Sequence, residues 1–397
     1  MLPLTLSTSR RAIRIAIDAS NIRVGGGVTH LIELLREADP AVHGFEKIFV
    51  WACKTTLARL DDKAWLEKRT DPALEAHLLK RIIWQRQTLP RLMSEVEADV
   101  QFVPGGSIVA KFGPVVTMSR NMLPFEWLEL RRFGFSATTL KLMLLRWNQS
   151  NSFKRADGTI FLTGYAHDAV TTVTGPLKGK TTIIPHGVDT RFRLDPRRQR
   201  PVDEFTAQDP LRVVYVSTVD EFKHQWHVVE AIGQLRAEGI PVRLDLYGPA
   251  RGSTLPRLTE ALRKVDGEGQ FIRYWGAVDY KEIHKCYTAA DICVFASSCE
   301  NMPNILIESM AAGLPIACSD RGPMPEMLGE GGVYFDPENA TSIANAVREL
   351  ATHPELRTEK ATRAFAASSN FSWTRCANET FGFLEAMAWK HPERTAA

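Results

Sequence analysis

The sequence lacks the patterns that mark secreted and membrane-spanning proteins. Its six cysteines include no Cys-x-x-Cys pair, and most of them lie in apolar runs, where a buried free thiol is the expected state. This cysteine usage favours a reducing compartment over a disulfide scaffold. No run of about 20 uncharged apolar residues is present, so we expect no membrane-spanning helix. Residues 1–20 contain no long apolar segment ahead of a cleavage site, so we expect no signal peptide and a cytoplasmic location.

Motifs for metal binding and for dinucleotide binding are also missing. The chain has no Asp-x-Asp and no His-Glu-x-x-His, and we therefore expect no metal site. The glycines at 25–27 do not form Gly-x-Gly-x-x-Gly, and Asp18 comes too early to bind the ribose of a dinucleotide. A dehydrogenase is therefore disfavoured. The small net charge of +3 argues against nucleic acid as the partner.

Positive charge is concentrated in the first half of the chain. Residues 1–200 hold 30 Lys and Arg against 19 Asp and Glu, whereas residues 201–397 hold 19 against 27. The basic half either faces something anionic, such as a phospholipid surface or a phosphate-bearing acceptor, or is an ordinary solvated surface. Residues 131–155 mix apolar side chains with six Lys and Arg. They form either a basic amphipathic helix at a bilayer surface or a buried helix with solvated ends, and we favour the buried helix.

Short apolar runs alternate with helical patterns along the whole chain. Such alternation predicts parallel sheets that are covered by helices on both faces. Two series of strands predict an α/β fold of two Rossmann-like domains, with parallel sheets facing each other across a cleft. The polar, proline-rich segment 190–210 is the predicted linker. Strands are expected at 12–18, 46–51, 99–103, 114–119, 157–162 and 181–185, and then at 211–217, 242–247, 271–275, 291–296, 314–318 and 333–335, with helices such as 224–238 and 340–352.

One segment of the second half carries two carboxylates near the start of a predicted helix. An apolar strand (DICVFA) leads into a polar loop, and Pro303 then precedes the helix NILIESMAAG, which Gly313 ends. Glu300 lies in the loop, and Glu308 lies eight positions later within the helix. Both side chains can point into the predicted cleft. The alternative is two surface carboxylates that flank a helix start by chance.

This segment resembles the E-x7-E motif of glycosyltransferase family 4. The run VVYVSTVDEFKHQWHVVEAI resembles the family's strand–loop–Lys–helix element, RYWGAV its base-binding element, and GPMPEMLGEGGVYFDPEN the stretch after the motif. In the first half, DASNIRVGGGVTHLIELL resembles the family's glycine-rich first loop, and IIPHGVD the segment before the linker. The resemblance is strong over residues 211–340 and weak over 50–150. It implies a GT-B fold with an acceptor domain at 1–195, a nucleotide-sugar domain at 196–378 and a C-terminal helix in 379–397 that returns to the first domain.

The resemblance also implies an activity. It predicts retaining, metal-independent transfer of a hexose from a GDP-, UDP- or dTDP-linked donor, with no further cofactor. The KHQWHVVEAI element resembles that of bacterial surface-polysaccharide transferases, which predicts a glycan or lipid-linked acceptor and peripheral contact of the basic first domain with the inner face of the cytoplasmic membrane. The missing Asp-x-Asp agrees, because GT-A transferases use that motif to hold a divalent cation. Two alternatives are a sugar-nucleotide epimerase of the GT-B fold and a catalytically silent nucleotide-sugar or glycan-binding protein. The sequence carries no signal for an oligomeric state.

The expected donor site combines two carboxylates, a lysine and a helix start. In the family, the second Glu of the motif binds the ribose hydroxyls, which is the role expected of Glu308. Glu300 would accept hydrogen bonds from the donor sugar near the developing oxocarbenium charge. Lys223 would neutralise the β-phosphate that leaves, although a loop lysine without function is the alternative. The expected catalytic residues are thus Glu300 and Lys223, and the other donor-binding residues are Gly26, Gly27, Val278, Asn301, Met302, Asn304, Ile305 and Glu308.

The chain departs from the family at two positions. Many members place an Arg a few residues before the Lys, where this chain has the run STV. Lys223 therefore acts alone, or an Arg such as Arg251 or Arg321 substitutes. The family often has a His after the strand read here as VVTMS, where this chain has Arg120 and Asn121. These two residues are the candidates for contact with the acceptor or the donor sugar.

Overall fold

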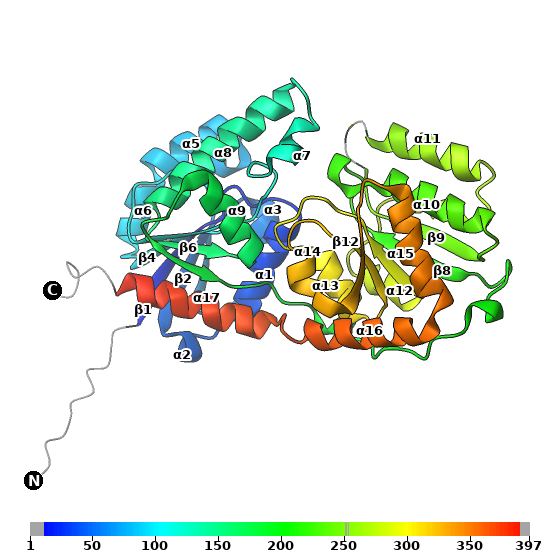
Figure 1. Ribbon diagram of the computed structural model, residues 1–397. Helices are drawn as coiled ribbons and strands as arrows, with labels where there is room; N and C mark the ends of the chain where they lie inside the picture. The colour runs from blue at the N-terminus through cyan, green and yellow to red at the C-terminus, as the bar shows by residue number, and fades with distance from the viewer. Residues whose placement is uncertain (1–11, 251, 253, 390–397) are drawn as a thin grey trace, which may run out of the picture.

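A computed structural model describes residues 12–250, 252 and 254–389, which form two α/β units side by side (Figure 1). The N-terminal unit is built on a seven-stranded sheet with the order β3-β2-β1-β4-β5-β6-β7, and all neighbouring strands pair parallel. Helices cover both faces of such a sheet, so its central strands are mostly apolar and are buried along their whole length. The strands are β1 (Ile13–Asp18), β2 (Phe45–Trp51), β3 (Leu66–Arg69), β4 (Val100–Val103), β5 (Val115–Met118), β6 (Gly158–Phe161) and β7 (Lys180–Ile183).

The C-terminal unit is built on a six-stranded parallel sheet with the order β10-β9-β8-β11-β12-β13. The strand order reverses beside β8, which is the place where open α/β sheets bind ligands. The loops that follow β8 and β11 at this point face the first unit. The strands are β8 (Leu211–Val216), β9 (Val242–Tyr247), β10 (Ile272–Tyr274), β11 (Ile292–Phe295), β12 (Ile316–Ser319) and β13 (Gly332–Phe335).

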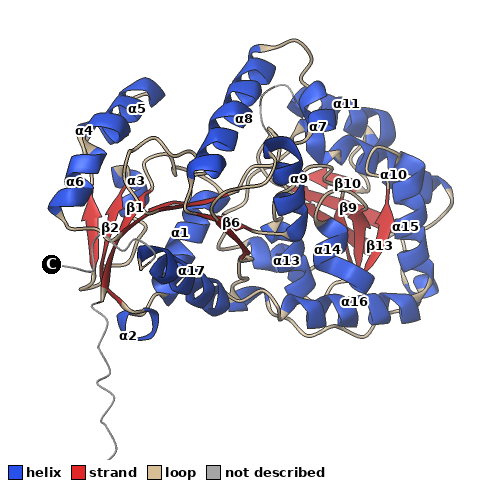
Figure 2. Cartoon of the chain, turned by 60° about the vertical axis from the view of Figure 1, so that its left-hand side comes forward, coloured by secondary structure: helices blue, strands red, loops and turns tan. Residues whose placement is uncertain are grey.

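The helices surround the two sheets (Figure 2). Several begin at a side-chain cap; for example, the Ser136 hydroxyl accepts a hydrogen bond from the Thr139 N–H at the start of the longest helix. The N-terminal unit contains α1 (Gly26–Glu37), α2 (Pro40–His43), α3 (Lys54–Leu57), α4 (Pro72–Glu75), α5 (Leu78–Gln87), α6 (Leu89–Glu95), α7 (Trp127–Arg131), α8 (Ala137–Arg155) and α9 (Gly164–Thr174). The C-terminal unit contains α10 (Gln225–Ala237), α11 (Thr254–Asp266), α12 (Ile283–Thr288), α13 (Asn304–Ala311), α14 (Met324–Leu328), α15 (Ala340–Thr352) and α16 (Pro354–Ser368).

The last described helix, α17 (Trp373–Ala388), leaves the C-terminal unit and packs on the first sheet's side of the molecule, against α1 and α2 (Figure 1). Its first residue, Trp373, stacks on His186, which in turn stacks on His30 of α1, with ring centroids 5.5 and 4.8 Å apart. Two chain segments therefore join the units, the one after β7 and the one between α16 and α17. The helix begins six residues before the start of the predicted C-terminal segment, and residues 390–397 lie outside the described residues.

Further contacts between the units come from side chains that cap or pair across the cleft. The Glu326 carboxylate of α14 accepts hydrogen bonds from the Gly164 and Tyr165 N–H groups at the start of α9 (2.7 and 2.8 Å). Arg132, just after α7, donates two hydrogen bonds to the Glu338 carboxylate (2.9 and 2.7 Å). These contacts hold the units together around the site between them.

All twelve predicted strands and both named helices are present, and the segment 190–210 carries only two 3-10 turns, Thr190–Phe192 and Val202–Glu204. The strand β3 was not predicted, because its sequence LEKR is a charged edge strand without apolar alternation. The preference for a buried helix in residues 131–155 is wrong. Four large apolar side chains of α8 (Leu140, Met143, Leu144 and Trp147) are exposed. None of the described helices is long and apolar enough to cross a bilayer.

Candidate active site

A cavity of about 460 Å³, the first cavity, lies between the two units at the carboxyl ends of the strands. Its walls come from the start of α1, from the loops after β8, β9 and β11, and from α12 and α13. The lining includes eight of the predicted site residues together with several that were not predicted. The predicted ones are Gly26, Lys223, Val278, Glu300, Met302, Asn304, Ile305 and Glu308.

Lys223 and Glu300 form an ion pair inside this cavity. Lys223 is the last residue of a 3-10 turn after β8, and its side chain is 10% exposed against 15% for Glu300. The next residue, His224, has a left-handed backbone (φ 52°) and its Nε2 lies 2.9 Å from the Ser298 hydroxyl oxygen. A left-handed backbone is uncommon for a residue other than glycine, and the contact with Ser298 stabilises the turn that contains Lys223.

Glu308 lies within α13, eight residues after Glu300, and is 4% exposed. The Tyr280 hydroxyl donates a hydrogen bond to one carboxylate oxygen (2.9 Å), and the Tyr287 hydroxyl lies 3.4 Å from the other. Burial raises the pKa of Glu308 to about 7, and the two tyrosines and the nearby Arg191 guanidinium offset only part of that effect. The site therefore holds a carboxyl group whose charge changes near neutral pH.

Because of Glu308, the free energy of unfolding is expected to fall as pH rises from about 4.5 to about 7. The native carboxyl keeps its proton up to about pH 7, whereas the unfolded one releases it near its ordinary value of 4.5. The native state thus binds more protons in this window, and raising pH removes at most about 3 kcal/mol of stability. Urea unfolding of the wild type and of Glu308→Gln at both ends of the window measures the difference. The variant should lose this part of the slope and be the more stable protein above neutral pH; equal slopes would contradict the prediction.

The start of α13 forms another wall of the first cavity. The helix begins at Asn304, directly after Pro303. The first N–H groups of a helix have no partner within it and carry partial positive charge, so this wall suits an anion. The His186 Nδ1 lies 3.0 Å from the Asn304 side-chain oxygen and fixes the orientation of that amide. Gly26 lies beside this wall, since a Cβ on it would be 3.9 Å from the Arg120 side chain and 4.0 Å from the Asn304 side chain.

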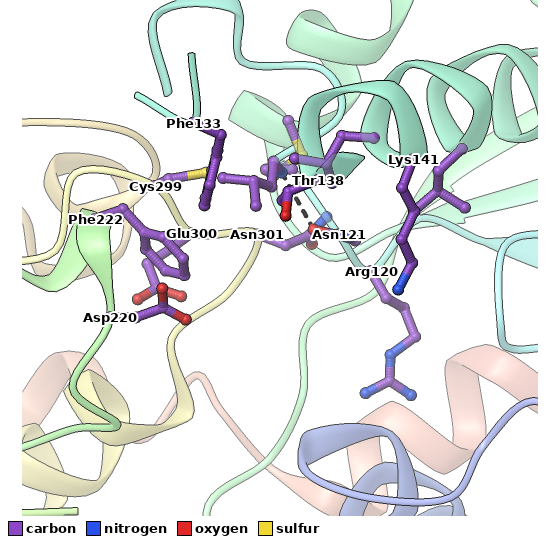
Figure 3. A pocket seen from close by; sticks show the side chains of 14 residues that line it. Arg120, Asn121, Phe133, Thr138, Lys141, Asp220, Phe222, Cys299, Glu300 and Asn301 are labelled. Carbon is purple, nitrogen blue, oxygen red and sulfur yellow. Dashed lines mark hydrogen bonds between the residues drawn. The ribbon is translucent and has the colours of Figure 1, made fainter. Parts of the chain in front are cut away.

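A second cavity of about 470 Å³ adjoins the first. In Figure 3, Arg120 and Lys141 enter it from one side, and Asp220, Phe222 and Glu300 enter it from the other. Among the described residues, Glu300 is the one that lines both cavities. The other lining residues are Asn121, Met122, Leu123, Phe133, Thr138, Leu142, Leu145, Cys299 and Asn301.

The predicted residues are therefore divided between the two cavities. Arg120, Asn121 and Asn301 line the second cavity, and the Asn301 side chain donates to the Ser119 hydroxyl of the first unit (3.3 Å). Gly27 is not among the residues described as lining either cavity, and its carbonyl oxygen is 3.4 Å from an Arg120 nitrogen. Burial lowers the pKa of Arg120 to about 10, so this guanidinium is partly desolvated while still charged.

A second positively charged side chain lines the first cavity, and it is neither of the two arginines suggested by the sequence. Arg321, one of the two suggested substitutes, pairs with Asp320 and Asp336 and is not among the residues described as lining either cavity. Arg251 lies outside the described residues. Instead, Arg59 of the first unit, close after α3, lines the first cavity. No motif surrounds Arg59, so its position in the first cavity is visible only in the structure.

Comparison with known proteins finds a match between the second unit and a described family model. Residues 210–353 match the family model described as Glycosyl transferases group 1. The O-antigen chain mannosyltransferase B of Escherichia coli is 27% identical over 170 residues, which are 42% of this chain and 44% of that protein. The chain spans about half the length of the curated relatives it matches.

Solved structures match over nearly the whole chain. Sucrose-phosphate synthase from Thermosynechococcus elongatus superposes with a TM-score of 0.74 at 17% identity, covering 94% of this chain and 98% of that one. HepE from Anabaena, in complex with UDP-glucose, superposes with a TM-score of 0.69 at 17% identity, covering 94% of this chain and 99% of that one. These likenesses confirm the predicted GT-B fold, and the family match confirms the predicted resemblance to glycosyltransferases.

Proposed function

We propose that this chain, whose residues 210–353 form a Glycosyl transferases group 1 domain, is a retaining, metal-independent glycosyltransferase of family 4. It moves a hexose from a nucleotide-diphosphate sugar to a glycan or lipid-linked acceptor. One observation carries the proposal: two cavities of similar size meet at the single carboxylate of Glu300. A donor in the first cavity and an acceptor in the second would bring the reacting atoms together beside that carboxylate.

The first cavity offers a partner for each part of the donor. Both Glu308 and Val278 line this cavity. The Glu308 carboxylate, when ionised, would accept hydrogen bonds from the two ribose hydroxyls, and Val278 would contact the base. The start of α13 and Lys223 face the diphosphate. Their positive charge is what a metal-free site requires, and Arg59 adds a second side-chain cation. HepE, the structural neighbour with UDP-glucose, supports a nucleotide sugar as the ligand of this fold.

The proposed reaction retains the configuration at the anomeric carbon. The bond from that carbon to the β-phosphate oxygen breaks, and the bond to the acceptor oxygen forms on the same face of the sugar. The acceptor's hydroxyl proton passes to the leaving phosphate, whose charge Lys223 stabilises. Glu300 then has two tasks: it accepts hydrogen bonds from the donor sugar, and its negative charge stabilises the oxocarbenium-like transition state.

The proposed acceptor is a glycan or lipid-linked glycan that is extended during surface polysaccharide synthesis. The match to an O-antigen chain mannosyltransferase supports it, because that relative's name describes growth of such a glycan. The second cavity fits this substrate class, since Arg120 and Lys141 could face a phosphate while Asp220 and Glu300 could face sugar hydroxyls. The reaction would take place in the cytoplasm, at the inner face of the membrane that carries the acceptor.

A nucleotide panel tests the proposal in two steps. First, GDP, UDP, dTDP and ADP are compared by thermal shift, where the cognate nucleotide should raise Tm by binding the native state. Second, the matching nucleotide sugars are incubated with free and lipid-linked glycans. Release of nucleoside diphosphate only when an acceptor is present is the expected result. Conversion of the donor sugar without an acceptor would indicate an epimerase, and binding without turnover on any acceptor would indicate a silent binding protein.

A further inference from the structure

The helix α8 presents an apolar stripe to solvent. Leu140, Met143, Leu144 and Trp147 are spaced as i, i+3, i+4 and i+7, which places them on one face of the helix. They are 62, 49, 60 and 68% exposed. A stripe of this spacing normally covers a core, yet α8 already packs its opposite face, which includes Leu142, against the first unit. The stripe is therefore available to something outside the chain.

Neighbouring residues extend the stripe into a larger surface. Trp127 and Leu128 of α7 and Phe135 of the connecting loop are exposed as well. The helices α7 and α8 pack against each other and lie at the same upper end of the molecule in Figures 1 and 2. We call the exposed face of residues 127–147 the α7–α8 face. It contains seven of the large exposed apolar side chains of the described residues.

Positive charge predominates around the α7–α8 face. Residues 130–156 contain six Lys and Arg and no Asp or Glu. Arg132 is neutralised by Glu129 and Glu338. Within the described chain, no ion pair is formed by Lys154 or Arg131, and the Arg131 guanidinium instead lies 5.4 Å from the Trp127 ring centroid. The face thus combines unburied apolar side chains with unneutralised positive charge.

An anionic bilayer surface satisfies both features at once. Its headgroups attract Lys and Arg, its acyl boundary accepts Leu and Met, and tryptophans such as Trp127 and Trp147 favour the interface between them. A second copy of this chain fits less well, because pairing two such faces would bring positive charges together around an apolar contact. The charge of the face therefore selects the membrane over self-association.

The helix α8 lies between the α7–α8 face and the second cavity, because the residues that line this cavity are on the side of α8 opposite the apolar stripe. Thr138, Lys141 and Leu142 of α8 line that cavity, and Glu300 lies across it (Figure 3). We propose that the α7–α8 face docks the chain on an anionic phospholipid surface, so that the second cavity lies about one helix diameter (~10 Å) from that surface and takes up its acceptor from it. The acceptor part of this inference rests on the proposed function, whereas the docking part does not.

Co-sedimentation with vesicles tests the docking without any turnover. Wild-type protein is mixed with phosphatidylcholine vesicles that do or do not contain phosphatidylglycerol. The expected result is binding to the vesicles with phosphatidylglycerol that weakens as salt is raised. The double variant Leu140→Ser/Leu144→Ser should lower the partition coefficient by about tenfold or more. Because both positions are exposed, its Tm should equal that of the wild type.

A matched control removes exposed apolar side chains elsewhere. Val42 of α2 and Ile183 of β7 are 66 and 47% exposed, and Val42→Ser/Ile183→Ser should bind vesicles like the wild type. Equal vesicle binding by both double variants would overturn the inference. Wild-type binding that is the same with and without phosphatidylglycerol would overturn it as well. A dimer in sedimentation velocity that Leu140→Ser/Leu144→Ser abolishes would overturn it too, by showing a protein interface. Failure of the nucleotide panel with intact vesicle binding would reject the proposed function alone.

Discussion

Replacing Lys223 by alanine is expected to lower kcat/KM by about 2–4 kcal/mol, a factor of about 30 to 1,000. A unit charge about 4 Å from the leaving phosphate contributes on the order of 4 kcal/mol at an effective dielectric of 20. Lys223 is held for this task by the turn after β8 and by its pair with Glu300. Steady-state rates with the cognate donor, chosen by the nucleotide panel, measure the effect. Unchanged activity would mean that the phosphate is held elsewhere, for example by Arg59.

Loss of the ammonium group also leaves a carboxylate without its partner, so stability has to be separated from catalysis. Glu300 is mostly buried, and an unpaired charge there destabilises the fold. The double variant Lys223→Ala/Glu300→Gln removes both charges and should regain Tm while remaining inactive. Lys285→Ala is the matched control, because that lysine is exposed and, among the described residues, pairs only with Glu282 at the N-cap of its helix. It should keep wild-type kcat/KM.

Those features of the fold that depend on local pattern could be predicted from the sequence. The strands around 211–217 and 291–296 are short apolar runs between turn residues, and parallel sheets require such runs. The placement of Glu300 after β11 and Lys223 after β8 then follows, because neighbouring parallel strands end at the same edge of a sheet. Their convergence on one cavity is a consequence of that topology.

Features that depend on packing between distant segments could not be predicted. Arg59 lies in the first unit, and only the closure of the two units brings it into the first cavity. Tyr280 and Tyr287 hold the Glu308 carboxyl, but neither stands in a motif that specifies this contact. The exposure of Leu144 was missed for the same reason: an apolar residue in a helical pattern has the same local signal whether the helix faces a core or solvent.

The second large effect is expected from Glu300→Gln, which keeps the shape of the side chain and removes its charge. Glu300 lies where the two cavities meet, so its charge is close to the carbon at which the bonds break and form. Positive charge develops on the donor sugar mainly in the transition state, so the variant should lose kcat rather than donor binding. We expect kcat to fall by about 100- to 1,000-fold, equivalent to about 3–4 kcal/mol, with KM for the donor changed by less than about threefold.

The split between kcat and KM distinguishes a role in the reaction from a structural role. If Glu300 only oriented Lys223, then Glu300→Gln would act through the phosphate and would weaken binding of the free nucleoside diphosphate as well. Thermal shift with that nucleotide should instead be preserved in the variant. Glu330→Gln, at an exposed carboxylate that pairs with Arg363, is the matched control and should leave both kcat and KM unchanged. If Glu300→Gln kept the wild-type kcat, the reaction would not take place beside this carboxylate. The reason for placing donor and acceptor in the two cavities would then be lost as well.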